Sequence, residues 1–361
     1  MKILVIHASA GAGHLKAAEA VTAGIQAHTQ YEVELVDALD FASVFYKRLY
    51  QKSYLFLISK VPIIWALCFA LMDIPLLQPV IRLARRFYNN LNMKRLQRHL
   101  INEQFHYIIS THFMPTEIAA ALKRRGMIAS HVITCVTDFD VHRIWLAEGV
   151  DIFTVASDWT KEKLKSMGVD GDIVRVTGIP THEKFCGPFD KGALKAQLEL
   201  KPDMFTVLIA TGSFGIGPIE EIIQALKDVQ VIVVCGYGKV LYERLSVKKY
   251  DNVKVCGLVD NMHELMAVAD VMITKPGGLS ISEALVSELP MIFFSAIPGQ
   301  EENNVKVLKE SDVGISRCGI AEIAQQLEHY KSSPQDFQAA VEKARALGRP
   351  HAVRDILSLI K

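Results

Sequence analysis

The chain has 361 residues, half of them hydrophobic, with a formal net charge of +1. That length exceeds one ordinary hydrophobic core and suits two domains of about 150–180 residues each. The six cysteines are scattered without a CxxC pair, which excludes a disulfide framework and indicates reduced thiols in a cytosolic protein. Residues 1–7 predict a strand rather than the charged start of a signal peptide.

The first part of the chain has the pattern of a doubly wound parallel sheet. A strand is predicted at 2–7, followed by the glycine-containing loop ASAGAGH, a helix at about 15–28 and a strand at 31–36. Strand, glycine loop, helix and strand in this order are typical of the start of such a sheet. Further strands are predicted at 107–110, 132–136, 152–156 and 174–177.

A second α/β series follows residues 179–192, which contain two prolines and show no clear period. We interpret this segment as a linker. Strands are then predicted at 206–210, 231–235, 253–255, 271–274, 291–294 and 314–316. Two Rossmann-like domains in tandem predict a ligand cleft at the carboxyl ends of both sheets. We expect an N-terminal domain at 1–180, a C-terminal domain at 181–345, and a final helix at 346–361 that packs back on the first domain.

An insert at about 41–100 interrupts the alternation of predicted strands and helices. Residues 41–130 carry 13 Lys and Arg against 3 Asp and Glu, and the apolar run at 61–72 has 12 residues. A membrane-spanning helix needs about 20 apolar residues, so we expect an interfacial helix pair instead. The alternative is a helical subdomain whose apolar face is simply core. The side chains expected at an anionic membrane or lipid acceptor, rather than at nucleic acid, include Trp65, Arg82, Arg85 and Arg86.

The first glycine loop suggests a catalytic base. His14 follows Gly13 at the start of the predicted helix, and a neutral imidazole there can take a proton from an acceptor hydroxyl. The alternative is a capping or packing histidine. A dinucleotide site is a rival interpretation, because Asp37 ends the second strand, but Lys16 stands where the third glycine of that fingerprint belongs.

A second group of polar residues follows the strand predicted at 132–136. Asp138 lies in the sequence TDFD, and we expect it to face the acceptor, to orient His14, or merely to cap the strand end. The spacing also matches a metal-binding DxD pattern, but three-residue matches are frequent by chance, and we predict no metal site. Trp145 is expected to shape the acceptor pocket.

The C-terminal domain carries two phosphate-type loops. Gly212 and Ser213 open a glycine loop directly after a strand, and Gly277 and Gly278 separate a strand from a helix. Glycines at such a position let backbone N–H groups approach a phosphate at the helix N-terminus. Another short loop is expected to hold a base through residues that include Val259 and Met262.

Two further side-chain groups suit a nucleotide sugar. Glu283 lies on the helix after the glycine pair, where its carboxylate can accept hydrogen bonds from ribose hydroxyls. Gln300 and Glu301, in the loop PGQEENN after the next strand, can bind sugar hydroxyls in the same way. The alternatives are a surface carboxylate and a solvated loop.

Several stretches together resemble one family. The sequences SAGAGHLKAAEA, TDFD, VTGIPTHEKF, GLVDNMHELMAVADVMITKPGGLSISEAL and PGQEENN resemble monogalactosyldiacylglycerol synthases and processive diacylglycerol glucosyltransferases. They are more distantly similar to the N-acetylglucosaminyltransferase that makes lipid II. The matching stretches span nearly the whole chain in the family's order, although the first loop is AGAGH where relatives often have three consecutive glycines.

The resemblance implies a GT-B fold, a UDP-sugar donor in the C-terminal domain, and inversion at the anomeric carbon without metal or other cofactor. It implies that Glu283 binds the ribose, that Gln300 and Glu301 bind the hexose, and that the insert docks on the membrane. By the same comparison, the residues near the diphosphate are Gly277, Gly278 and Ser280.

The predicted reaction is transfer of a hexose from a UDP-hexose to diacylglycerol, with His14 or Asp138 as the base. The predicted location is the cytoplasm, with peripheral attachment to the inner face of the cell membrane. Alternatives are another lipid-linked glycosyltransferase, a UDP-sugar epimerase on the same fold, or an NAD(P)-binding oxidoreductase.

Overall fold

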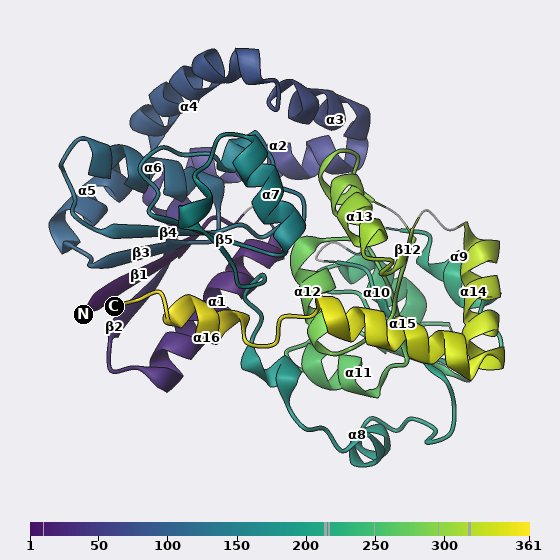
Figure 1. The fold of residues 1–361 in the computed structure, drawn as a ribbon. Helices are drawn as coiled ribbons and strands as arrows, with labels where there is room; N and C mark the ends of the chain where they lie inside the picture. The colour runs from purple at the N-terminus through teal and green to yellow at the C-terminus, as the bar shows by residue number, and fades with distance from the viewer. Residues whose placement is uncertain (10, 213–214, 216, 249, 295, 317–318) are drawn as a thin grey trace. The chain divides into compact units, whose positions relative to one another are not determined.

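The computed structural model describes residues 1–361 apart from 10, 213–214, 216, 249, 295 and 317–318. The chain forms two compact units. The first comprises Met1–Glu183, Ile297–Asn303 and His351–Lys361, and the second comprises Lys184–Ala296 and Asn304–Pro350. Each unit contains a six-stranded sheet (Figure 1).

The first sheet is parallel and has the strand order β2-β1-β3-β4-β5-β6. Ile3 on β1 pairs with Val33 on β2 and with Tyr107 on β3. The central strands are apolar on both faces because helices cover both, as parallel sheets require. The strands are β1 (Lys2–His7), β2 (Glu32–Asp37), β3 (Tyr107–Ser110), β4 (His131–Cys135), β5 (Ile152–Val155) and β6 (Val174–Val176).

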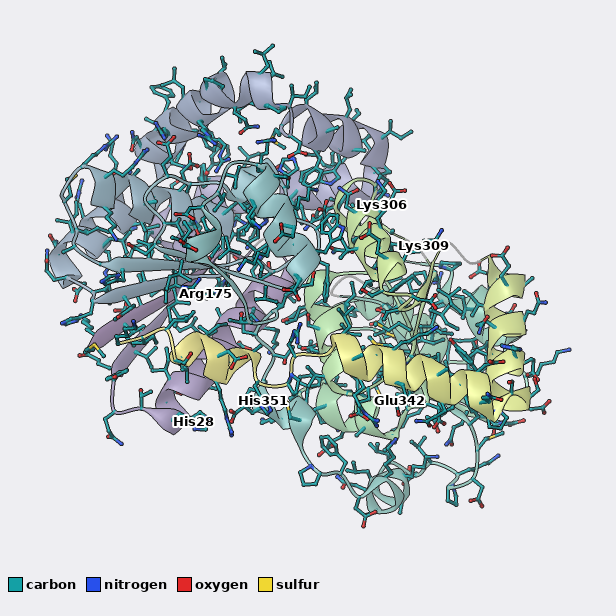
Figure 2. All side chains as sticks on the ribbon, in the orientation of Figure 1. His28, Arg175, Lys306, Lys309, Glu342 and His351 are labelled. Carbon is teal, nitrogen blue, oxygen red and sulfur yellow. The ribbon has the colours of Figure 1, made fainter. Side chains whose placement is uncertain are left out.

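One face of this sheet is covered by α1 (Ala12–His28), whose buried Ala18, Val21 and Ile25 share a cluster with Ile3. The final helix α16 (Ala352–Leu357) lies beside α1 (Figure 1). The two helices approach so closely at Gly24 that a Cβ there would lie 2.2 Å from Cγ1 of Val353. Figure 2 shows His28 near the end of α1 and His351 just before α16.

The insert forms four helices, and α4 and α5 pack against α6 (Phe113–Arg124). No single helix among the described residues is long and apolar enough to span a membrane, but α2 and α3, bent by 111° at their junction, meet the length and composition criteria as a pair. The four helices are α2 (Val44–Lys60), α3 (Pro62–Leu71), α4 (Gln78–Asn92) and α5 (Lys94–Glu103). The first unit also contains α7 (Asp158–Ser166).

The second sheet is also parallel, with the order β12-β11-β10-β7-β8-β9. Its strands are β7 (Thr206–Ala210), β8 (Gln230–Val234), β9 (Val253–Cys256), β10 (Val271–Thr274), β11 (Met291–Phe293) and β12 (Ile315–Ser316). The predicted strands of both series are therefore present, with ends that differ by one residue or less.

The helices of the second unit alternate with these strands up to β12, and α14 and α15 then follow in succession. They are α8 (Lys191–Gln197), α9 (Ile219–Ala225), α10 (Lys239–Ser246), α11 (Met262–Val268), α12 (Gly278–Val286), α14 (Ile320–Ser332) and α15 (Pro334–Leu347). Helix α13 (Gln300–Glu310) begins in the segment that packs with the first unit and continues into the second.

Strand order locates a candidate site in each unit. In doubly wound sheets, ligands bind outside the carboxyl ends of the strands, where the strand order reverses. That point lies between β1 and β3 in the first sheet, and between β7 and β10 in the second. The loops that leave these strands carry most of the residues predicted from the sequence.

Candidate active site

The loop after β1 positions His14 in the first turn of α1. The turn requires glycine, because Gly11 at the helix N-cap has φ 136°. Nδ1 of His14 lies 2.7 Å from the carbonyl oxygen of Thr111 and 2.9 Å from the hydroxyl oxygen of Thr137. In return, the Thr111 hydroxyl donates to the carbonyl oxygen of His14 at 2.8 Å. Groups that follow β3 and β4 thus hold the imidazole in one orientation.

The surroundings of His14 keep it neutral at physiological pH. Burial lowers the pKa of its imidazole from 6.5 to about 4, although the hydrogen bond to the Thr111 carbonyl partly opposes that shift. A neutral imidazole has one ring nitrogen with a free electron pair, as a general base requires. The role of His14 as the base stays a prediction, and a neutral imidazole is compatible with it.

His14 borders a cavity of about 300 Å³ in the first unit. Its wall is mainly aromatic, and Tyr46, Tyr50 and Tyr54 follow one another at four-residue spacing along α2. Burial raises the pKa of Tyr50 to about 12, so its phenol remains protonated. The other lining residues include Leu57, Trp65, Phe69, Met72, Tyr88, His112, Phe113, Trp145 and His142.

One side of this cavity carries a buried ion pair. The Arg85 guanidinium donates to Oε2 of Glu117 through Nε at 3.0 Å, and to the carbonyl oxygen of Ile144 at 3.1 Å. Asn89 also donates to the same Glu117 oxygen. The Arg85 charge is compensated by Glu117, so this wall offers polar groups with little net charge.

Asp138 lines the same cavity as His14. The hydrogen-bond partners of the His14 ring are Thr111 and Thr137, so an orienting role of Asp138 stays a prediction. The Asp138 carboxylate accepts hydrogen bonds from Nε2 of Gln300 at 3.2 and 3.3 Å. The second aspartate of the DxD pattern, Asp140, forms an ion pair with Lys163.

The remaining residues predicted for acceptor or membrane lie in different places. Trp65 and Trp145 line the cavity, and Gly13 precedes His14 in α1. Arg82 and Arg86 lie outside the cavity and share the carboxylate of Glu148, with N–O distances of 3.2 and 3.7 Å. The three arginines predicted as one group thus have two different environments.

The glycine pair of the second unit separates β10 from α12, as predicted. Gly277 is the N-cap of α12, and Gly278 is its first residue. The amide of Asn304 donates to the carbonyl oxygen of Pro276 at 3.1 Å and fixes the approach to this turn. Ser280 lies in the first turn of α12, and Glu283 lies further along it and is half-buried.

The other predicted donor residues are described in part. Gly212 follows β7 with φ 68°, whereas Ser213 lies outside the described residues. Val259 precedes α11, and Met262 begins it. Glu301 accepts a hydrogen bond from the backbone N–H of Ile297 at 2.6 Å, within the segment that packs with the first unit.

The contacts of Asp37 argue against the dinucleotide alternative. Its carboxylate accepts hydrogen bonds from the backbone N–H groups of Ser9 and Leu39, and from Lys47 at 2.9 Å. A dinucleotide site needs an acidic group at this strand end to bind ribose hydroxyls. Here that group is already used to hold the glycine loop and the start of the insert.

Sequence reasoning missed Thr111 and Thr137 as partners of His14. Nothing in the local sequence marks them, because they lie 97 and 123 residues from the histidine. Their position at the ends of β3 and β4 was the available signal, since neighbouring parallel strands bring their carboxyl ends together.

Comparisons with known proteins show the family of this chain. Residues 14–181 match the monogalactosyldiacylglycerol synthase family, and residues 206–315 match the glycosyltransferase family 28 C-terminal domain. The chain is 31% identical over 291 residues to the processive diacylglycerol beta-glucosyltransferase of Staphylococcus saprophyticus, an alignment that covers 77% of this chain and 74% of that enzyme. Other enzymes of the same name align over about 60% of their length.

Solved structures share the fold at low sequence identity. MurG of Acinetobacter baumannii has a TM-score of 0.61 at 14% identity, with 99% of each chain covered. UDP-GlcNAc 2-epimerase of Neisseria meningitidis has a TM-score of 0.61 at 13% identity and the same coverage. The predicted fold, GT-B with two Rossmann-like domains, is confirmed, but transferases and epimerases share it, so the fold alone does not decide the reaction.

Proposed function

Because the chain belongs to the family of monogalactosyldiacylglycerol synthases and processive diacylglycerol glucosyltransferases, we propose that it transfers a hexose from a UDP-sugar to the free hydroxyl of diacylglycerol. The product is a glycosyldiacylglycerol. The observation that carries this proposal is a neutral histidine, His14, at the wall of an aromatic cavity. That combination places a base beside a site suited to a lipid acceptor.

The reaction is a single displacement with inversion. The acceptor oxygen attacks the anomeric carbon, its proton passes to Nε2 of His14, and the bond between that carbon and the UDP oxygen breaks. UDP leaves with the electron pair of that bond. Our proposal assigns no metal or other cofactor to the step.

The second unit supplies the groups for the leaving diphosphate. Negative charge grows on the diphosphate oxygens as the bond breaks, and backbone N–H groups at a helix N-terminus stabilise such charge. The turn formed by Gly277 and Gly278 presents such groups at the start of α12. Glu283, on the same helix, is our candidate for the ribose hydroxyls.

Gln300 and Glu301 remain our candidates for the hexose hydroxyls. The Gln300 amide donates to Asp138 in the structure. We expect this amide to exchange its carboxylate partner for a sugar hydroxyl when the donor binds.

The insert supports the proposed docking on a membrane. On α4, one stripe of apolar side chains is exposed to solvent, including Val80 at 69%, Leu83 at 70% and Phe87 at 69%. The residues of α4 turned to the other side, Gln78 and Asn89, are buried. A helix with one exposed apolar face suits the boundary between lipid headgroups and acyl chains.

Basic groups on the insert suit an anionic leaflet. Arg48, Lys52 and Lys60 are exposed on α2, a helix that also exposes apolar side chains such as Phe45 and Phe56. Each such group near an anionic surface contributes about 1 kcal/mol to binding. We propose peripheral attachment to the inner face of the cell membrane.

One experiment tests the reaction. The purified protein is incubated with diacylglycerol liposomes and either labelled UDP-glucose or labelled UDP-galactose, and the lipid products are identified. We expect a labelled glycosyldiacylglycerol and release of UDP that depends on diacylglycerol. Donor turnover that is independent of the lipid would refute the proposal, and interconversion of UDP-sugars without lipid would identify an epimerase instead.

A second experiment tests docking. Binding to vesicles is measured by flotation with neutral and with anionic lipids, at low and at high salt. We expect stronger binding to anionic vesicles and a decrease with salt, because salt screens charges at the surface. Equal, salt-insensitive binding to both vesicle types would refute the electrostatic part of the proposal.

A further inference from the structure

Three histidines line the cavity of the first unit, and their hydrogen bonds fix which ring nitrogen carries the proton. They are His14, His112 and His142. Since one nitrogen of a neutral imidazole donates and the other accepts, the partner of one nitrogen determines the state of the other. All three have lowered pKa values because they are buried, so the neutral forms are the relevant ones.

His14 carries its proton on Nδ1. The carbonyl oxygen of Thr111, 2.7 Å away, has no hydrogen to offer, so Nδ1 must be the donor. The hydroxyl oxygen of Thr137, at 2.9 Å, is a second acceptor for the same N–H. Nε2 therefore holds the free electron pair.

His112 is the opposite tautomer. Its Nδ1 accepts a hydrogen bond from the backbone N–H of Met114 at 3.1 Å and so caps the start of α6. Nε2 must then carry the proton. The ring of His112 is 4.7 Å from that of His14, centroid to centroid, in an edge-to-face arrangement.

The two rings therefore offer complementary groups to a ligand. Among the hydrogen bonds of the described residues, none engages Nε2 of His14 or Nε2 of His112. His142 differs, since its Nδ1 accepts from Ile144 and its Nε2 donates to the carbonyl oxygen of Phe69 at 2.9 Å. His14 presents an acceptor and His112 presents a donor, whereas both nitrogens of His142 are occupied.

We propose that His112 is a further acceptor-binding residue, whose Nε2–H donates to an ester carbonyl oxygen of diacylglycerol while Nε2 of His14 receives the proton of the neighbouring hydroxyl. The inference rests on the proposed function. Apart from its hydroxyl, diacylglycerol has only ester oxygens that can accept a hydrogen bond. An N–H next to the base therefore has the ester as its partner, and this contact directs the free hydroxyl toward His14.

Two substitutions of His112 can distinguish the role of Nδ1 from the role of Nε2. His112→Asn keeps an acceptor near the position of Nδ1, so the cap on Met114 N–H and the start of α6 are retained. It lacks the Nε2–H donor. His112→Gln places an N–H near the position of Nε2 instead. His131→Asn is the matched control, because that side chain is 63% exposed and lies outside the cavity lining.

The test combines these variants with two acceptors. One is diacylglycerol, and the other is the dialkylglycerol of the same chain length, in which ethers replace the esters and the carbonyls are absent. We expect wild type and His131→Asn to use the ether lipid with about three- to tenfold lower kcat/KM, the loss of one neutral hydrogen bond. His112→Asn should lose a similar factor on diacylglycerol and no longer distinguish the two lipids, while His112→Gln recovers part of the discrimination.

Nitrogen-15 NMR of the histidine rings supplies a readout that does not depend on activity. We expect the Nδ1–H tautomer for His14 and the Nε2–H tautomer for His112 at neutral pH. The opposite tautomer for His112, or full ester discrimination by His112→Asn, would overturn the inference while leaving the proposed transferase intact. Absence of any diacylglycerol-dependent transfer by wild type would instead refute the proposed function.

Discussion

The substitution His14→Asn removes the proposed base and retains the hydrogen bond by which the side chain contributes to the fold. The asparagine amide can still donate to the Thr111 carbonyl from the position of Nδ1, but it has no basic nitrogen. Removal of a general base lowers turnover by about 10²–10⁴-fold. We therefore expect a folded protein with kcat reduced by that factor on diacylglycerol liposomes.

The same variant has a measurable effect on stability. The folded protein resists protonation of His14 until about pH 4, whereas the unfolded chain takes up the proton near pH 6.5. Stability from this group is thus fully present above pH 6.5 and is lost as the pH falls from 6.5 to about 4. At about 1.4 kcal/mol per pH unit, the loss amounts to about 3 kcal/mol.

The assay is urea unfolding of wild type and His14→Asn between pH 7.5 and pH 4. All three tryptophans (Trp65, Trp145 and Trp159) lie in the first unit, so their fluorescence reports the unit that contains His14. We expect the free energy of unfolding of the variant to rise relative to wild type by up to about 3 kcal/mol toward pH 4. His131→Asn serves as the control, since its side chain is largely exposed.

Parallel pH profiles for wild type and His14→Asn would refute this reasoning, because they would mean that the pKa of His14 is not lowered by folding. The same pKa predicts how kcat depends on pH: kcat should fall at acid pH only near pH 4, where His14 becomes protonated. An acid limb near pH 6.5 would mean that the base is a solvated histidine. Near-normal turnover of a folded His14→Asn would remove His14 as the base.

Three further predictions concern other parts of the first unit. Thr137→Val should lower kcat about three- to tenfold by removing one acceptor from Nδ1 of His14, while Thr137→Ser retains activity; equal kcat values for the two variants would contradict this role. Leu83→Glu should weaken vesicle flotation without changing the urea midpoint, because this side chain is 70% exposed; unchanged flotation would count against docking through α4. Gly24→Ala should reduce the free energy of unfolding by about 1–3 kcal/mol, because the added methyl group clashes with Val353. An unchanged urea midpoint would show that α1 and α16 move apart without cost.

Sequence alone predicted the strands and the glycine turns well, and the physical reasons are local. Buried parallel strands such as Ile3–Ile6 and Val271–Thr274 are continuous apolar runs bounded by polar or glycine residues. Glycine pairs between strand and helix mark phosphate-type turns by the backbone freedom they supply. These features depend on neighbours in the chain, so they can be read without the fold.

Long-range pairing could not be predicted in the same way. The sequence grouped Arg82, Arg85 and Arg86 as one basic patch, but Arg85 pairs with Glu117 in the cavity wall, while the other two share Glu148. Arg82 and Arg86 lie four residues apart on one face of α4, whereas Arg85 is one residue from Arg86 and points to another face; which acidic group each face meets is set by packing. Gln300 likewise bonds to Asp138, 162 residues away.

His14 shows most clearly which properties of a site residue the sequence predicts and which depend on the fold. Its type and its place after a glycine turn made it the candidate base from sequence alone, because local pattern put an imidazole at the start of a helix after a strand. Only the tertiary structure decided the low pKa of His14, its Nδ1–H tautomer and the neighbouring Nε2–H donor of His112. Those properties come from burial and from groups that directly follow β3 and β4, which approach His14 only when the sheet is assembled.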